Sequence, residues 1–69
     1  MISYKIKIED LNNQSEGRII REALFDAGAD GVSVNAARKE VVIDSDLTVE
    51  EIYEVIEDAG FTPTDLELV

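Results

Sequence analysis

Four short parts of the chain have strand-like patterns: in three of them apolar and polar residues alternate with a period of two, and the fourth, residues 40–44, is a short apolar run between two acids. Residues 2–8 alternate isoleucine and tyrosine with serine and lysine, which is typical of a half-buried strand. Residues 32–35 and 40–44 predict two further strands joined by a turn over 35–39. The residues after Pro63 alternate again and predict a fourth strand.

Two segments between these strands carry apolar residues at helical spacing. The first segment predicts a helix over 14–27, and Gly28 provides a left-handed end. The second helix begins with a Thr48-x-x-Glu51 capping box and ends at Gly60. The apolar stripe of the first helix comprises Ile19, Ile20, Ala23, Leu24 and Ala27.

An internal repeat supports the resulting βαββαβ order. Residues 22–28 (EALFDAG) match residues 54–60 (EVIEDAG) at a constant offset of 32. Two βαβ units with right-handed crossovers form a four-stranded antiparallel sheet with both helices on one face. We therefore expect one α+β domain over 1–69, a ferredoxin-like sandwich.

The charge is unevenly distributed along the chain. The formal net charge is −10, from 16 acidic and 6 basic side chains. Residues 1–39 contain six acids and six bases, whereas residues 40–69 contain ten acids and no base. An acidic chain of this kind repels nucleic-acid phosphates and anionic lipid, so we expect neither as a partner.

Two residue types with distinctive chemistry are absent. The chain has no cysteine, so it lacks disulfides, thiolate metal sites and a thiol nucleophile, and it has no histidine. Zinc, haem and iron–sulfur centres therefore lose their usual ligands, and we expect no cofactor. No apolar run approaches the ~18 residues of a membrane span, and no signal-peptide core is present. We expect a monomeric protein of the cytoplasm.

The order of the motifs resembles the heavy-metal-associated domain family of copper chaperones and copper-ATPase N-terminal domains. The likeness extends over Leu24, residues 31–35, residues 41–43, Glu51-Ile52 and the ending Ile56-Glu-Asp-Ala-Gly-Phe61. The family's functional motif is Gly-Met-x-Cys-x-x-Cys, placed between the first strand and the first helix. Counting back from Leu24 places Leu11 at the Met position and Asn13 and Glu16 at the two cysteine positions. An amide and a carboxylate do not replace two soft thiolates as ligands for copper(I).

Two interpretations of the segment around Asn13 remain open. In the first, Asn13 and Glu16 form a variant capping box at the start of the first helix. In the second, the oxygens of Asp10, Asn13 and Glu16, with Asn12, form a weak site for a hard cation such as calcium or magnesium. The metal function is then either lost or supplied by oxygen ligands, or by ligands shared with a partner.

The second helix provides the remaining candidate site. Its acidic residues have no base one turn away, which predicts either a solvated face or a docking surface for a basic protein. Leu11 and Phe61 are expected to form an apolar centre beside it. We expect no enzyme, because acylphosphatases of the same element order require an arginine-bearing loop after the first strand. The acidic residues are Glu50, Glu51, Glu54, Glu57 and Asp58.

Overall fold

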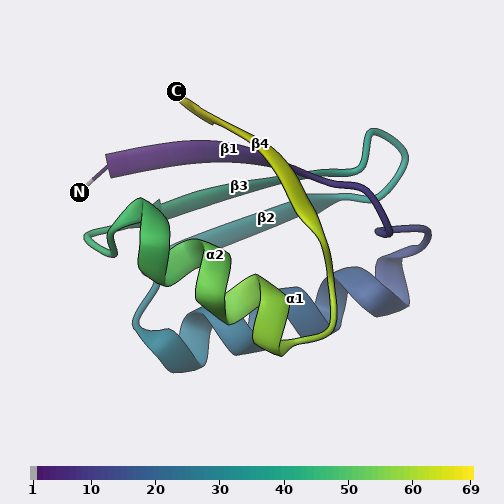
Figure 1. Cartoon of the computed structure of the whole chain (residues 1–69), viewed down its shortest axis with the longest axis horizontal. Helices are drawn as coiled ribbons and strands as arrows, with labels where there is room; N and C mark the ends of the chain where they lie inside the picture. The colour runs from purple at the N-terminus through teal and green to yellow at the C-terminus, as the bar shows by residue number, and fades with distance from the viewer. Residues whose placement is uncertain (1) are drawn as a thin grey trace.

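The computed structural model of the chain describes residues 2–69 and contains the six predicted elements in the predicted order (Figure 1). The first helix has its predicted bounds, and two strands are one residue longer than predicted. Gly31 extends one strand because it pairs with Asp44, and Ser45 extends the next because it pairs with Ile2. The elements are β1 Ile2–Ile8, α1 Gln14–Ala27, β2 Gly31–Asn35, β3 Glu40–Ser45, α2 Val49–Asp58 and β4 Pro63–Leu68.

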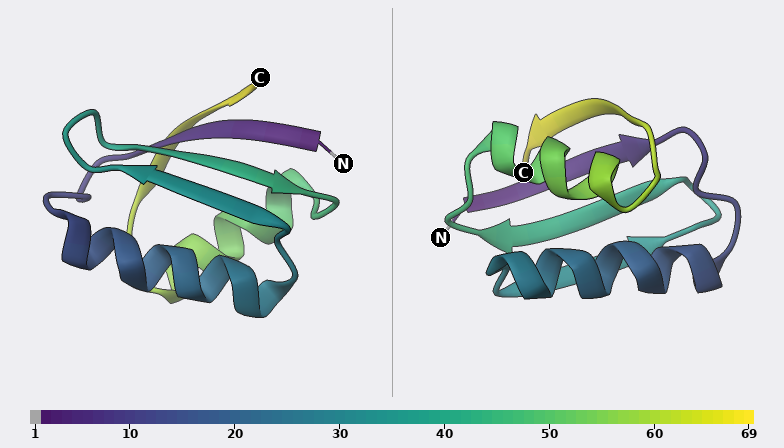
Figure 2. Two further views of the ribbon diagram at one scale, coloured as in Figure 1. Left: turned by 180° about the vertical axis from the view of Figure 1, so that it is seen from behind. Right: turned by 60° about the horizontal axis from the view of Figure 1, so that its bottom comes forward.

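The strands form one sheet in the order β2-β3-β1-β4, and every neighbouring pair is antiparallel. Both helices cover the same face of the sheet, as the two views of Figure 2 show. The second face carries the polar residues of the alternating strands, including an ion pair of 3.8 Å between Lys5 and Glu67. This arrangement confirms the ferredoxin-like sandwich and leaves β2 and β4 as the edge strands.

The two helices end in the same way, as the internal repeat predicts. Gly28 has φ +112° and Gly60 has φ +93°, a backbone region that favours glycine. In each case two amide hydrogens after the helix bond to carbonyls of the last turn, which is the Schellman arrangement. The pairs are Gly28 N with Phe25 O (3.1 Å), Ala29 N with Leu24 O (3.0 Å), Gly60 N with Glu57 O (2.9 Å) and Phe61 N with Ile56 O (3.1 Å).

The core lies between the sheet and the helices. Two residues of the predicted apolar stripe of α1 lie outside the core, because Ile19 is 52% exposed and Ala27 is also exposed. Ile20 and Leu24 form the buried stripe of α1, and Ile19 lies about 100° around the helix from Ile20. The core residues are Tyr4, Ile6, Ile8, Leu11, Ile20, Leu24, Ala29, Val41, Ile43, Ile52, Ile56 and Phe61.

Candidate functional site

Three connecting segments meet at the end of the molecule where β1 leads into α1. They are residues 9–13, the β2–β3 turn at 36–39, and the α2–β4 connection at 59–62. The Ile8 amide donates to the Lys39 carbonyl at 2.9 Å. The candidate ligand oxygens of the sequence therefore lie where segments distant in sequence converge.

Asp10 joins the first of these segments to the third. The Thr62 amide donates to Asp10 Oδ1 at 2.8 Å, and the Thr62 carbonyl accepts from the Glu9 amide at 3.0 Å. Both backbone polar groups of Thr62 are thus satisfied by residues 52 or more positions earlier. Asp10 therefore holds two connections together.

Asn13 is the N-cap of α1. Its Oδ1 accepts a hydrogen bond of 2.9 Å from the Glu16 amide, and its backbone is extended. The reciprocal bond differs from that of a capping box, because Glu16 Oε1 accepts from the Asn12 amide at 3.0 Å. Asn13 and Glu16 together bind amides at the start of the helix. The bond to Glu16 comes from Asn12, the residue before the N-cap, whereas in a capping box it comes from the N-cap itself.

Lys39 adds a cation to the same loop, which the sequence pattern does not predict. Its Nζ donates to the Glu9 carbonyl at 3.0 Å and to Asn12 Oδ1 at 3.3 Å. Lys39 has a left-handed backbone, with φ +56°, at the end of the β2–β3 turn. Because the contacts span 27 to 30 residues, no local spacing indicates them.

These contacts bear on whether the loop fits a metal ion. Copper(I) prefers soft sulfur ligands, and the chain has no cysteine, so the donors at Asn13 and Glu16 do not fit it. The oxygens proposed for a hard cation each accept a backbone amide, at Asp10, Asn13 and Glu16. Across residues 2–69, no cluster of three or more acidic, histidine or cysteine side chains is placed to hold a metal.

Leu11 and Phe61 do not form the surface that the sequence predicts. Leu11 is fully buried and Phe61 is 9% exposed, and both belong to the hydrophobic core. Their burial follows from the pairing of their neighbours Asp10 and Thr62, which draws the two connections over the sheet. The apolar centre proposed for a partner contact is therefore corrected to a structural one.

The acidic residues of α2, which we call the α2 acidic face, are all exposed. The face comprises Glu50, Glu51, Glu54, Glu57 and Asp58. Glu51 completes the capping box with Thr48, as predicted, with distances of 3.1 and 3.2 Å. No member of the face forms an ion pair within residues 2–69, and the last turn of α2 has no base. The face is an uncompensated negative surface.

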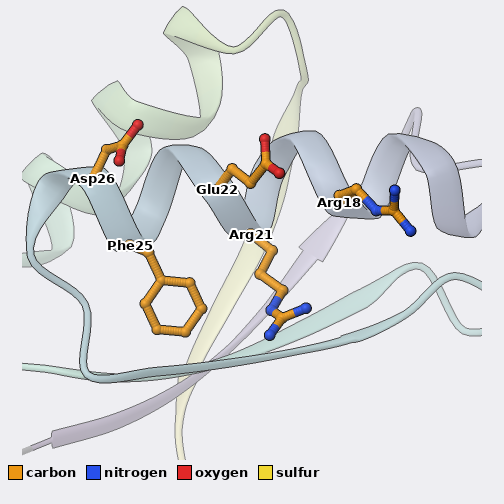
Figure 3. Close-up of a pocket in the computed structure, with 5 residues that line it drawn as sticks. All are labelled: Arg18, Arg21, Glu22, Phe25 and Asp26. Carbon is orange, nitrogen blue, oxygen red and sulfur yellow. The ribbon is translucent and has the colours of Figure 1, made fainter.

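A basic strip on α1 was not predicted. Arg18 and Arg21 lie on one side of α1, and the Arg21 guanidinium lies 5.6 Å from the centre of the Phe25 ring. Figure 3 shows Arg21 and Phe25 leaving the helix on one side, and Glu22 and Asp26 on the other. The spacing 18, 21, 25 predicts one helical face, but its position beside the sheet edge depends on the fold.

Comparison with known proteins adds the fold relationship. No protein-family model matches the chain, and no curated protein matches it. A copper-binding domain of a P-type ATPase has a TM-score of 0.84 and 22% identity over 100% of this chain and 95% of that one. A heavy metal binding protein from Thermotoga maritima has a TM-score of 0.88 and 18% identity over 97% and 98%. The CopZ metallochaperone has a TM-score of 0.83 and 20% identity over 90% and 98%.

These likenesses establish that the chain has the fold of heavy-metal-associated domains over nearly its whole length. They agree with the resemblance in the sequence, while the cysteines of that resemblance are absent. The helices of residues 2–69 are all too short or too polar to cross a membrane.

Proposed function

We propose that this protein is a heavy-metal-associated-type domain that has lost the soft-metal thiolate site and acts as a small acidic protein-interaction module. The observation that carries the proposal is the loop after β1. The positions assigned to the ligands hold Asn13 and Glu16, and both side chains cover the start of α1. Lys39 and Asp10 complete a hydrogen-bonded loop. Side-chain hydrogen bonds thus occupy the loop at the positions assigned to the metal ligands, which supports the proposal.

The α2 acidic face supports a basic protein as the partner. Its five acids are exposed and lack compensating bases within residues 2–69, so they create a concentrated negative potential. Complementary charge accelerates encounter and selects among partners. The fold relationship supports the further proposal that this chain is a non-catalytic, cytoplasmic protein and makes this contact in metal homeostasis.

Titration with copper(I) under reducing conditions tests the loss of the metal site. We expect no one-to-one binding tighter than micromolar, because no thiolate is available. A tight stoichiometric complex would overturn the proposal. Calcium and magnesium should leave the NMR shifts of Asp10, Asn13 and Glu16 unchanged, and saturable shifts there would instead support a hard-cation site.

The double substitution Asn13→Cys with Glu16→Cys provides the positive control. If these residues occupy the ligand positions, two thiolates at this spacing should create a one-to-one copper(I) site. Loss of the Asn13 cap costs about 1 kcal/mol, so folding is checked first by circular dichroism. A folded variant without copper(I) binding would show that the assignment of the ligand positions is wrong.

Interaction through α2 is tested with a lysine-rich peptide as the probe. We expect the variant Glu54→Gln, Glu57→Gln, Asp58→Asn to bind the peptide at least fivefold more weakly than the unmodified protein. The matched control is Glu22→Gln, Asp26→Asn, Asp30→Asn, which removes the same charge from exposed positions outside α2. Equal losses in the two variants would indicate attraction to net charge alone and would contradict a docking face on α2.

A further inference from the structure

The two edges of the sheet differ in how they are protected. The β4 edge begins at Pro63, carries Asp65 and Glu67, and pairs with β1 through a register shift. Proline, charge and irregular pairing are the features that keep edge strands from pairing with other chains. The β2 edge, residues 31–35, has no proline, no charged residue and no register shift. It is the open edge of the sheet.

A groove of about 310 Å³ runs between α1 and β2. Val32 and Val34 line it from the side of the sheet that faces the helices, and Ser33 lines it from the opposite side. Because residues from both faces of the strand contribute, the groove follows the free edge. The α1 wall of the groove contains Arg18 and Arg21.

Arg18 and Arg21 have no acidic partner among residues 2–69. The chain contains 16 acidic side chains, yet neither Arg18 nor Arg21 forms an ion pair or a side-chain hydrogen bond within residues 2–69. Glu22 and Asp26 line the same hollow as Arg18, Arg21 and Phe25, and Figure 3 shows both acids on the side of the helix away from Arg21. Neither acid forms an ion pair with an arginine within residues 2–69. The guanidinium groups are therefore available to carboxylates from another molecule.

We propose that the β2 edge binds an extended acidic segment of a partner protein by strand addition, with Arg18 and Arg21 selecting its carboxylates. The backbone of the segment pairs with β2, which supplies affinity, and its side chains supply specificity. Acids two residues apart on a strand lie about 7 Å apart on one face. Arginines three apart on a helix are separated by about 4.5 Å along its axis, and their long side chains span the difference. Each guanidinium can bind a carboxylate through two parallel hydrogen bonds.

In this proposal the acidic residues of the partner are concentrated in the bound segment, and the rest of the partner is weakly charged. The net charge of −10 repels a strongly acidic protein at long range, but screening limits that repulsion to about 8 Å at physiological salt. Phe25, 40% exposed, is one turn beyond Arg21 and offers an apolar contact to the same segment. The surface is distinct from the α2 acidic face, which attracts charge of the opposite sign.

The probe for this proposal is an eight-residue peptide alternating threonine with glutamate, compared with one alternating threonine with glutamine. Titration of the peptide into ¹⁵N-labelled protein should shift the amide signals of residues 31–35. The glutamate peptide should bind at least tenfold more tightly than the glutamine peptide. Shifts confined to α1 would overturn strand addition. A dimer seen by sedimentation without peptide, with concentration-dependent shifts of residues 31–35, would overturn the proposal of a separate partner. The β2 edge would then bind a second copy of this chain.

Arginine variants decide whether the selection is local. Arg18→Gln and Arg21→Gln should each weaken binding of the glutamate peptide at least fivefold. Arg38→Gln removes the same charge from an exposed position in the β2–β3 turn and should change binding less than twofold. An equal loss in Arg38→Gln would overturn the proposal. The α2 variant Glu54→Gln, Glu57→Gln, Asp58→Asn should bind this peptide no more weakly, so the two surfaces can fail independently.

Discussion

At the scale of single residues, Thr62 illustrates how the loop after β1 is held. Its amide and its carbonyl both pair with that loop, and one carboxylate, Asp10, supplies half of the link. The link crosses the sequence from residue 10 to residue 62 and covers Leu11 and Phe61. A half-buried acid thus has a structural role that its position in a polar loop does not reveal.

Asp10→Ala should destabilise the fold by about 1 kcal/mol, because the Thr62 amide loses its partner. For a domain of this size the midpoint of thermal unfolding should fall by about 4–8 °C. Asp10→Asn keeps a side-chain oxygen acceptor, so its midpoint of thermal unfolding should be close to that of the unmodified protein. Equal losses in the two variants, measured by circular dichroism, would assign the effect to charge and contradict the hydrogen-bond explanation.

Gly17 is a second residue whose role depends on packing. It is buried in α1, and a Cβ at this position would clash with Val34 Cγ1 in β2. The absence of a side chain therefore sets how closely α1 approaches the edge strand. This spacing also shapes the groove that contains Arg18 and Arg21.

Gly17→Ala should destabilise the protein by about 1–3 kcal/mol through overpacking against Val34. In the double variant Gly17→Ala, Val34→Ala the contacting methyl groups are gone, so Gly17→Ala should cost less in the Val34→Ala background than in the unmodified protein. Without the clash, the preference of alanine over glycine in a helix, about 1 kcal/mol, favours the variant. Urea unfolding of Gly17→Ala, Val34→Ala and the double variant measures the coupling. Strictly additive losses would show that the Val34 contact is not the cause.

At the scale of elements, α2 combines a favourable start with an unfavourable end. Glu50 and Glu51 lie in its first turn, where the helix dipole is positive, and Glu51 completes the capping box. Glu57 and Asp58 lie near its C-terminal end, where the dipole is negative and no base compensates. The helix therefore retains acids at a cost in stability, which agrees with a role for its charge outside folding.

Glu57→Gln should unfold at a temperature about 3–8 °C higher than Glu50→Gln. Both variants remove one negative charge from an exposed position on α2, so the general repulsion changes by a similar amount. The difference between them isolates the helix dipole. Identical unfolding temperatures in low salt would show that the dipole contributes nothing measurable here.

At the scale of the whole molecule, the charge is separated across the fold. Most of the acids of residues 40–69 lie on β3, α2 and β4; Glu67 pairs with Lys5, whereas the α2 acidic face forms no ion pair within residues 2–69. The arginines of α1 face the opposite edge of the sheet, beside β2. The molecule thus presents an acidic face on α2 and, beside β2, a groove whose charged lining consists of Arg18 and Arg21.

Added salt should stabilise the protein, because screening reduces the self-repulsion of a chain with a net charge of −10. The midpoint of thermal unfolding should rise by several degrees between about 10 mM and 500 mM sodium chloride, where the Debye length falls from about 30 Å to below 8 Å. The variant Glu54→Gln, Glu57→Gln, Asp58→Asn should show a smaller rise. A midpoint that falls with salt would mean that attractive pairs dominate the surface.

Much of the fold follows from local patterns. The bounds of α1, the Thr48–Glu51 capping box and the glycine ends at Gly28 and Gly60 are confirmed, because each depends on residues within one or two helical turns. The wrong prediction at Ile19 concerns a property that depends on tertiary packing and not on local pattern. An apolar residue at the border of a helical stripe is buried or exposed according to the rotation of the helix on the sheet, which packing decides.

The sequence by itself determined the βαββαβ order, the helix caps and the absence of thiolate ligands, since these depend on residue chemistry and on periods of a few residues. Only the tertiary structure decided that Leu11 and Phe61 belong to the core and that Asp10 pairs with Thr62. It also decided that β2 is an open edge beside Arg18 and Arg21. Such contacts join segments far apart in the chain, and no local spacing encodes them.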